Sequence, residues 1–325
     1  WRDAARSPRR RRAVTARPAP PRTPCRVTPG QAPAVPVVFD SPHSGYAWPA
    51  DFVPVAPEPA IRTTWDAHVD ALLADAPAAG ITLLAATFPR AYVDVNRDAA
   101  DLDPDLLAAP WPQPLAPTDY SRRGMGLVRR LALPGVPMYD APLLPDAVEA
   151  RLAQWYRPYR TLLAGWLADV RAAHGLVWHV DWHSMKSVGN AMNVDAGARR
   201  PDIVVSDRRG TTAVPGLVAR IVGWFTLRGY VVTANDPYQG GDLVRTFGAP
   251  ADGCSSVQVE LNRALYMDEA TCEPHAGFAA LRADLAEFAG VIGTWAREAA
   301  RDAAREAARD TARDAARAAA APDAR

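Results

Sequence analysis

Residues 175–185, GLVWHVDWHSM, form one of the most apolar runs of the chain and predict a buried strand. Polar side chains interrupt this run. Burying such side chains without partners is costly. Successive side chains of an extended strand point to opposite faces, so His179, Asp181 and His183 fall on one face. Either they form a buried hydrogen-bonded ladder, or one histidine binds a metal while Asp181 orients a neighbour. We favour His183 as the ligand, because it lies nearest the carboxyl end of the strand, and expect a structural role for His179.

Further short apolar runs, bounded by turn residues, predict more buried strands. They are PVVFDSPHSG (36–45), GITLLAATFPR (80–90), AYVDVNRD (91–98), PDIVVSD (201–207), YVVTAND (230–236) and SVQVELNR (256–263). Segments with helical spacing lie between several of them, at residues 65–79, 145–174, 214–227 and 276–295. Strands that alternate with helices predict an α/β fold, with a single mixed sheet flanked by helices. Residues 98–142 form a long excursion, and loops of that length are usually lids or binding elements.

The two ends of the chain differ in composition from the middle. Residues 1–33 are rich in Arg and Pro and poor in apolar residues, so we expect a disordered leader. Residues 297–325 repeat Arg, an acid and Ala with a period of four, which predicts a solvated helical tail that protrudes from the core. Residues 34–296 remain as the folded domain.

Overall composition is typical of a globular protein. Hydrophobic residues make up 49% of the chain, but no run approaches the roughly 18 consecutive apolar residues of a membrane helix. The net charge is +1 and the charges beyond the leader are nearly balanced, so we expect neither a membrane nor nucleic acid as a partner. Cys25, Cys254 and Cys272 are too few and too scattered for a disulfide framework, which indicates a cytoplasmic protein.

Two further segments carry candidate metal ligands. His43 lies in a turn after a predicted strand, where the backbone can aim its imidazole into the crevice that forms at the carboxyl ends of strands. The alternative for His43 is a hydrogen-bonded turn histidine. Asp66 stands at the start of a predicted helix, where it either caps the helix or presents an oxygen ligand, and His68 competes for the ligand role.

These candidates make up a recognisable ligand set. Two imidazoles and a carboxylate, here His43, His183 and Asp66, with a fourth position left to water, are typical of a hydrolytic zinc site, although they also suit Mn, Co or Fe. Zinc lowers the pKa of its water towards about 7 and polarises a carbonyl group. A base must take the proton, and we expect Glu260 to do so, because burial in the apolar run around it raises the pKa of a carboxyl group.

The order of these motifs resembles that of the N-formylglutamate amidohydrolases, across roughly residues 35–295. The matching segments are SPHSG (41–45), DAHVD (66–70), YVDVNRD (92–98), DWHSM (181–185), NDPYQGG (235–241) and QVELNRALYM (258–267). The resemblance implies a fold like that of the zinc carboxypeptidases and the related deacylases. It also implies that residues 34–296 form a catalytic domain that hydrolyses N-formyl-L-glutamate to formate and L-glutamate, a late step of one route of histidine degradation.

By motif position the resemblance implies metal ligands at His43, Asp66 and His183 and a catalytic acid at Glu260. The dicarboxylate substrate that it implies needs cations with a fixed fork geometry, which Arg supplies better than Lys. We expect Arg97 first, as both a catalytic and a substrate-binding residue; its alternative role is a salt bridge to neighbouring acids.

Other polar residues complete the expected substrate site. They are Asn96, Asn235, Arg245 and Arg263. Each has a simpler alternative: Asn235 could cap a turn, Arg263 could anchor its strand, and the Gly-Gly turn before Arg245 could be ordinary loop punctuation rather than a flexible closure.

Two other functions compete with this prediction. The first keeps the fold and the metal but acts on another N-acyl amino acid, or on a peptide. The second is a non-catalytic ligand-binding protein on the same scaffold. The sequence leaves the metal's identity and the oligomeric state open, and the expected partner is a small acidic substrate.

Overall fold

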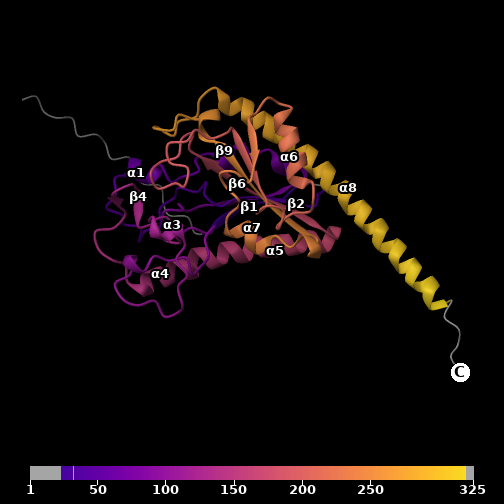
Figure 1. Cartoon of the computed structure of the whole chain (residues 1–325), viewed down its shortest axis with the longest axis horizontal. Coiled ribbons are helices and arrows are strands. Elements are labelled where there is room, and N and C mark those ends of the chain that lie inside the picture. The colour runs from indigo at the N-terminus through magenta and orange to yellow at the C-terminus, as the bar shows by residue number, and fades with distance from the viewer. Residues whose placement is uncertain (1–22, 32, 320–325) are drawn as a thin grey trace, which may run out of the picture.

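A computed structural model describes residues 23–31 and 33–319 of the chain (Figure 1). The strands are β1 (Cys25–Thr28), β2 (Val37–Ser41), β3 (Thr82–Ala86), β4 (Leu131–Leu133), β5 (Val136–Pro137), β6 (Val177–Met185), β7 (Ile203–Ser206), β8 (Val232–Ala234) and β9 (Cys254–Asn262). The α-helices are α1 (Glu58–Arg62), α2 (Val69–Leu72), α3 (Asp119–Arg122), α4 (Pro145–Arg151), α5 (Arg157–His174), α6 (Leu217–Thr226), α7 (Asp242–Phe247) and α8 (Gly277–Ala319). Short 3-10 turns and one π-helical turn, Leu152–Tyr156, lie between them.

One mixed sheet organises the molecule, which confirms the predicted α/β class. Its strand order is β1-β3-β2-β6-β9-β7-β8. The central strands β3, β2, β6 and β9 are parallel, whereas β1 and β7 run antiparallel to their neighbours β3 and β9. Parallel central strands end at the same edge, so the residues at their carboxyl ends come together there.

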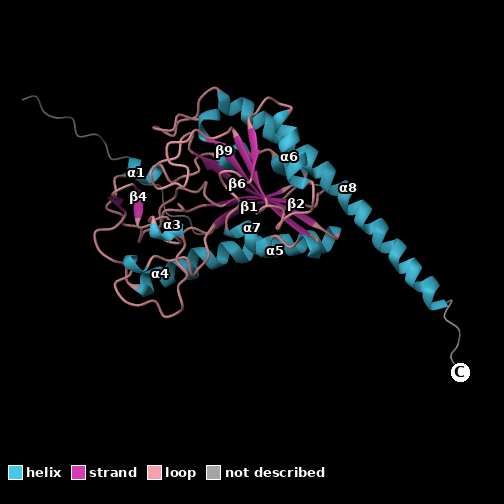
Figure 2. Cartoon of the chain, in the orientation of Figure 1, coloured by secondary structure: helices cyan, strands magenta, loops and turns pink. Residues whose placement is uncertain are grey.

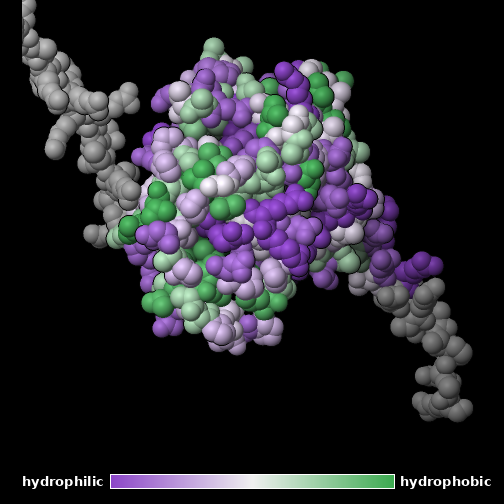
Figure 3. Space-filling model, turned by 60° about the vertical axis from the view of Figure 1, so that its left-hand side comes forward, coloured by the Kyte–Doolittle hydropathy of each residue, from purple (hydrophilic) through white to green (hydrophobic). Residues whose placement is uncertain are grey.

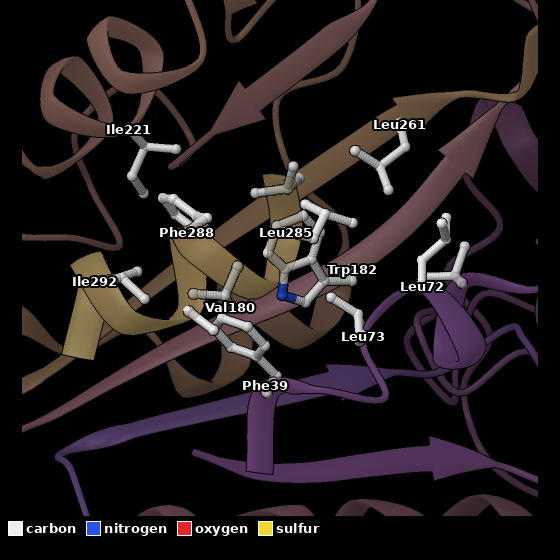
Figure 4. Close-up of a cluster of buried hydrophobic side chains, with 14 of the residues drawn as sticks. Phe39, Leu72, Leu73, Val180, Trp182, Ile221, Leu261, Leu285, Phe288 and Ile292 are labelled. Carbon is white, nitrogen blue, oxygen red and sulfur yellow. The ribbon is translucent and has the colours of Figure 1, made fainter. Parts of the chain in front are cut away.

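Helices cover both faces of this sheet, as Figure 2 shows. Helices α6 and α8 pack on one face and α5 on the other, and each face has its own apolar cluster. Figure 4 shows the first cluster, in which Trp182 of β6 lies between Phe39 of β2 and Phe288 of α8. Trp182 and Phe288 are both fully buried.

Alternation along β6 divides apolar from polar side chains, as the sequence predicts. Val180 and Trp182 belong to the cluster beneath α8. His179 lies on the opposite face, where its imidazole contacts Asp40 Oδ1 at 2.8 Å and Ser256 Oγ at 2.7 Å. The ladder alternative is therefore realised at His179, and it fixes β6 to β2 and β9.

Three expectations need correction. Residues 91–98 form turns rather than a strand, and they place Asp94 against His43 and Arg90 instead of adding to the sheet. The helix expected at 65–79 shrinks to α2 and a 3-10 turn. Cys25–Thr28, inside the expected leader, form the edge strand β1, which pairs with β3; only Cys25 of this strand is buried, so its sequence carries little apolar signal. Residues 1–22 and 32 of that leader lie outside the described residues.

The expected tail is helical as far as Ala319, because α8 continues from the core through the Ala-rich repeat. Within α8, the side chains of Phe288, Ile292 and Ala296 are buried in the core, whereas those of residues 301–313 are exposed. The distal part projects away from the sheet (Figure 1).

The surface mixes hydrophilic and hydrophobic residues. On the face in Figure 3, hydrophilic residues form a broad central area and hydrophobic ones lie in smaller groups around it. Within the described part of the chain, every helix is too short or too polar to cross a lipid bilayer.

We predict that deleting residues 301–325 changes the free energy of unfolding by less than about 0.5 kcal/mol, because the deleted side chains make no core contacts in the described range. Phe288→Ala, in the buried part of the same helix, costs roughly 3–5 kcal/mol. Denaturant unfolding of both variants tests this, and a large loss on truncation would contradict the exposed position of residues 301–313.

Candidate metal centre

Three residues far apart in the sequence meet at the carboxyl edge of the sheet. His43 follows β2, and His183 lies near the end of β6, the strand that pairs in parallel with β2. Asp66 comes from the turn before α2, which is held there by a hydrogen bond from its backbone N to the carbonyl O of His43 (3.2 Å). Adjacent parallel strands thus supply both imidazoles, and a loop supplies the carboxylate.

The side chains of these residues could hold a metal ion. One ligand atom from each of His43, Asp66 and His183 lies within 4.8 Å of the others, and all three residues are buried. Asp66 Oδ2 is 3.1 Å from His183 Nδ1 and 3.4 Å from His43 Nδ1. The two imidazole rings are 4.7 Å apart, centre to centre.

Carboxylates lie behind both imidazoles, but only the contact of Asp94 with His43 is a hydrogen bond, because Asp181 Oδ1 makes none among the described residues. Asp94 Oδ1 is 2.7 Å from Nε2 of His43, and Asp181 Oδ1 is 2.8 Å from Nε2 of His183. This leaves each Nδ1 directed to Asp66. Nδ1 of His43 is buried and makes no hydrogen bond within the described part of the chain, as expected of an atom kept for a cation.

The charges around the centre favour a cation. Burial alone raises the pKa of Asp66, but the hydrogen bond from His183, the adjacent His43 imidazole and the charge of Arg90 outweigh it and hold that pKa well below its usual range. Burial lowers the pKa of His183, yet the adjacent Asp181 carboxylate reverses the sign and raises it well above its ordinary value. Without a metal, a proton on His183 therefore balances the carboxylates, and a metal would displace it.

His68, the competing candidate, lies outside this group. Its Nε2 contacts the carbonyl O of Cys272 at 2.8 Å, and its ring packs against Trp65. The structure therefore brings Asp66, and not His68, to the two imidazoles.

Glu260 lies beside the centre, on the strand next to His183. In the parallel pairing of β6 and β9, Glu260 is the register partner of His183. Burial raises the pKa of its carboxyl group to about 7, although the charge of His183 opposes the shift. Its Oε1 accepts a hydrogen bond of 2.8 Å from Gln258. A carboxyl group with this pKa can exchange a proton near neutral pH.

Two cavities adjoin the centre, and Arg90, Tyr238 and Glu260 line both. The larger, of ≈130 Å³, is also lined by Asp66 and Arg263. The smaller, of ≈90 Å³, is also lined by His183, Asn96, Arg97, Tyr120 and Gln258. The excursion at residues 98–142 contributes to both cavities. Tyr120 lines the smaller one, and Met125, Arg129 and Ala132 line the larger one.

Arg97 and Asn96 lie at the smaller cavity, although no strand precedes them. The Arg97 guanidinium stacks on the Tyr120 ring at 3.9 Å, and its Nε lies 4.0 Å from Asp94 Oδ2. Asn96 Nδ2 is 2.9 Å from His183 Nε2, and its Oδ1 accepts a hydrogen bond from the backbone N of Leu243 (2.8 Å). Asn96 thereby ties α7 to the centre.

Arg263 belongs to the centre itself. Its guanidinium donates to Asp66 Oδ1 at 2.9 Å and to the carbonyl O of Thr63 at 2.9 Å, so it orients the loop that carries Asp66. This resembles the expected anchoring role, and Arg263 also lines the larger cavity.

Arg245 and Asn235 lie farther out. Arg245 is half-exposed on α7 and forms an ion pair of 2.7 Å with Asp98. Asn235 has a left-handed φ of 57°, and its Oδ1 accepts hydrogen bonds from the backbone N of Asp207 (3.1 Å) and Arg209 (3.0 Å). Neither residue lines the two cavities at the centre, and Asn235 takes the turn-capping role that was its alternative.

Sequence reasoning missed several residues of the site. Asp94 and Arg90 form an ion pair of 2.7 Å behind His43, although in the sequence Asp94 is only one of the acids near Arg97. Its position inside an apolar run was an available signal, because a buried carboxylate needs partners. Arg129 and Lys186 lie in irregular segments that carry no periodic pattern.

Comparisons with known proteins point in one direction. The sequence profile of the family described as N-formylglutamate amidohydrolase matches residues 35–267. An N-formylglutamate deformylase from Pseudomonas aeruginosa is 32% identical over 257 residues, which cover 78% of this chain and 88% of that protein. One from Pseudomonas putida is 29% identical over 210 residues, or 64% of this chain and 71% of that protein.

Solved structures agree with these matches. The crystal structure of N-formylglutamate amidohydrolase from Ralstonia eutropha JMP134 is similar with a TM-score of 0.81 and 40% identity, over 85% of this chain and 99% of that one. The gene product Atu2144 from Agrobacterium tumefaciens has a TM-score of 0.56 at 19% identity, over 82% and 94% of the two chains, which shows a shared fold.

We predict that His43→Ala and His183→Ala each abolish measurable binding of a divalent cation, because each removes one of the ligand atoms that converge on Asp66. His68→Ala, the matched control, retains it. Metal analysis of the purified proteins and calorimetric titration measure this. Loss of the metal in His68→Ala, with retention in Asp66→Asn, would reverse the assignment of the third ligand.

Proposed function

Because the chain belongs to the N-formylglutamate amidohydrolase family, and is thus a hydrolase of amide bonds, we propose that it cleaves N-formyl-L-glutamate into formate and L-glutamate. We place this reaction in histidine degradation, in the cytoplasm. The buried free thiols of Cys25, Cys254 and Cys272 suit a reducing compartment. We assign the activity to residues 34–296, which hold the family match and every candidate site residue.

The observation that carries the proposal is the meeting of His43, Asp66 and His183 with Glu260 beside them in one crevice. We propose zinc as the ion, since two imidazoles and a carboxylate with an open position are typical of hydrolytic zinc sites. When bound, the ion supplies a Lewis acid that polarises the formyl carbonyl and lowers the pKa of water.

The protein's own residues divide the remaining work. Glu260 accepts the proton of the attacking water and then donates it to the departing amine, a role suited to a carboxyl group whose pKa burial raises to about 7. Arg97 is positioned by its stacking on Tyr120, and its Nε is buried without a hydrogen-bond partner in the described residues. It binds the α-carboxylate of the substrate beside the reacting groups, and so orients the amide for attack.

The substrate assignment is tested by a panel of N-formyl-, N-acetyl- and N-succinyl-L-glutamate. We expect the purified zinc-loaded protein to release formate from the first and to act poorly on the others. Enzymatic assay of formate, with glutamate measured in parallel, gives the result. Efficient turnover of another acyl compound, without formate release, would contradict the assignment while leaving the hydrolase class intact.

We predict that Glu260→Gln lowers kcat by about 10²–10⁴-fold, because the amide cannot take a proton, while the metal stays bound. Glu273→Gln, an exposed acid on the loop before α8, is the matched control and leaves kcat unchanged. Steady-state kinetics with metal analysis of each variant distinguish loss of the base from loss of the ion.

The same residue sets the pH dependence of the wild type. A base works only when deprotonated, so kcat/KM falls as the pH drops through the pKa of Glu260. Burial raises that pKa to about 7, and a bound cation, which favours the carboxylate, moves the acidic limb to lower pH. The limb is expected to vanish in the residual activity of Glu260→Gln, and an unchanged limb would assign it to another group.

A further inference from the structure

The larger cavity beside the centre is lined by more positively charged side chains than the proposed reaction uses. The basic residues that line it are Arg90, Arg129, Lys186, Arg200 and Arg263. Three of them have carboxylate partners: Arg90 pairs with Asp94 at 2.7 Å, Arg200 with Asp195 at 2.7 Å and Arg263 with Asp66 at 2.9 Å. The charges of the other two are not balanced in this way.

Arg129 is the exceptional member. It is only 8% exposed, and within the described part of the chain its guanidinium forms neither an ion pair nor a hydrogen bond. Burial and the nearby charges of Arg90 and Arg97 lower its pKa to about 9. Burying a guanidinium without a partner is strongly unfavourable. The position of Arg129 at a cavity wall therefore indicates that a bound ligand supplies the missing negative charge.

Lys186 shares this situation. It lies directly after β6, half-buried at the same cavity, and forms no ion pair within 4 Å among the described residues. Burial and the charge of Arg263 lower its pKa to about 8. A fork-shaped donor and a point charge on one cavity are suited to a carboxylate, which can accept from both.

We propose that Arg129, assisted by Lys186, binds the side-chain carboxylate of the N-acyl amino acid and makes the enzyme selective for acidic substrates. This rests on the proposed function. The α-carboxylate is attached next to the amide, so it stays near Glu260 and His183, where Arg97 lines the smaller cavity. The side-chain carboxylate lies two methylenes farther, and the larger cavity has the room.

The wall of the larger cavity also suits those methylenes. Met125, Ala132 and Met192 are buried apolar residues that line it. An apolar stretch that leads to a pair of cations matches an aliphatic arm that ends in a negative charge. The excursion at residues 98–142 supplies Met125, Arg129 and Ala132, and it therefore acts as the specificity element of the site.

The test compares Arg129→Met with the wild type on N-formyl-L-glutamate, N-formyl-L-glutamine and N-formyl-L-isoglutamine. We expect kcat/KM to fall on the order of 10²-fold, through KM, on the glutamate and isoglutamine compounds, which keep the side-chain carboxylate. On the glutamine compound, whose side chain ends in an amide, the loss is below about fivefold. Arg129→Lys restores part of the activity, because it keeps the charge without the fork.

Stability and controls separate recognition from a structural role. Arg129→Met removes an unpaired buried charge, so we expect its melting temperature, without substrate, to equal or exceed that of the wild type. Arg123→Met, an exposed arginine of the same loop, leaves kinetics and stability unchanged. Equal losses on all three substrates, or a melting temperature well below the wild type, would overturn the assignment. A loss on the glutamate and glutamine compounds that spares the isoglutamine compound, whose α-carboxylate is an amide, would move Arg129 to the α-carboxylate and overturn it as well.

Calorimetry with the products distinguishes this inference from the proposed function, because it needs no turnover. L-glutamate binds the zinc-loaded wild type more tightly than Arg129→Met, and L-glutamine does not discriminate between them. Arg129-dependent glutamate binding in a protein that releases no formate would support the carboxylate site and contradict the proposed reaction. Formate release with no dependence on Arg129 in either assay would support the proposed reaction and contradict the carboxylate site.

Discussion

The contact on which the site depends is the one that the Asp66 carboxylate makes with two imidazoles. Oδ2 of Asp66 faces Nδ1 of both His43 and His183, and Oδ1 is held by Arg263. Two of these residues are placed by adjacent parallel strands, whereas Asp66 is placed by a turn that hydrogen-bonds to His43. The packing of β2 against β6 therefore fixes the spacing of the imidazoles, and the loop fixes the carboxylate between them.

Around this contact the protein concentrates buried charge that a stable core would avoid. Asp94 and Asp181 support the imidazoles, Arg90 pairs with Asp94, and Arg129 lacks a partner in the described chain. Such an arrangement is stable only because the apolar clusters on both sheet faces offset its cost. These positions carry both proposals: His43, Asp66 and His183 could hold a cation, and the proposed carboxylate site lies at Arg129.

Much of this follows from the sequence. Period-two alternation in residues 175–185 predicts both the buried Trp182 and the polar face that carries His183, and the other apolar runs predict most strands. Strand order was beyond reach, because nothing local in β9 says that it inserts between β6 and β7. The run 91–98 has the pattern of a strand because Val93 and Val95 alternate with Asp94, but the segment forms turns and Asp94 is buried as a partner of His43. Arg129 carries no signal, since only the tertiary fold shows that it lacks a partner.

Anomalous diffraction at the zinc absorption edge, from crystals of the zinc-loaded protein, can locate a cation shared by His43, Asp66 and His183. A shared ion gives a single strong peak about 2.0–2.1 Å from Nδ1 of both imidazoles and about 2.0–2.2 Å from a carboxylate oxygen of Asp66. A peak bound through Nε2, or one located at other residues while this centre stays empty, would contradict this shared site.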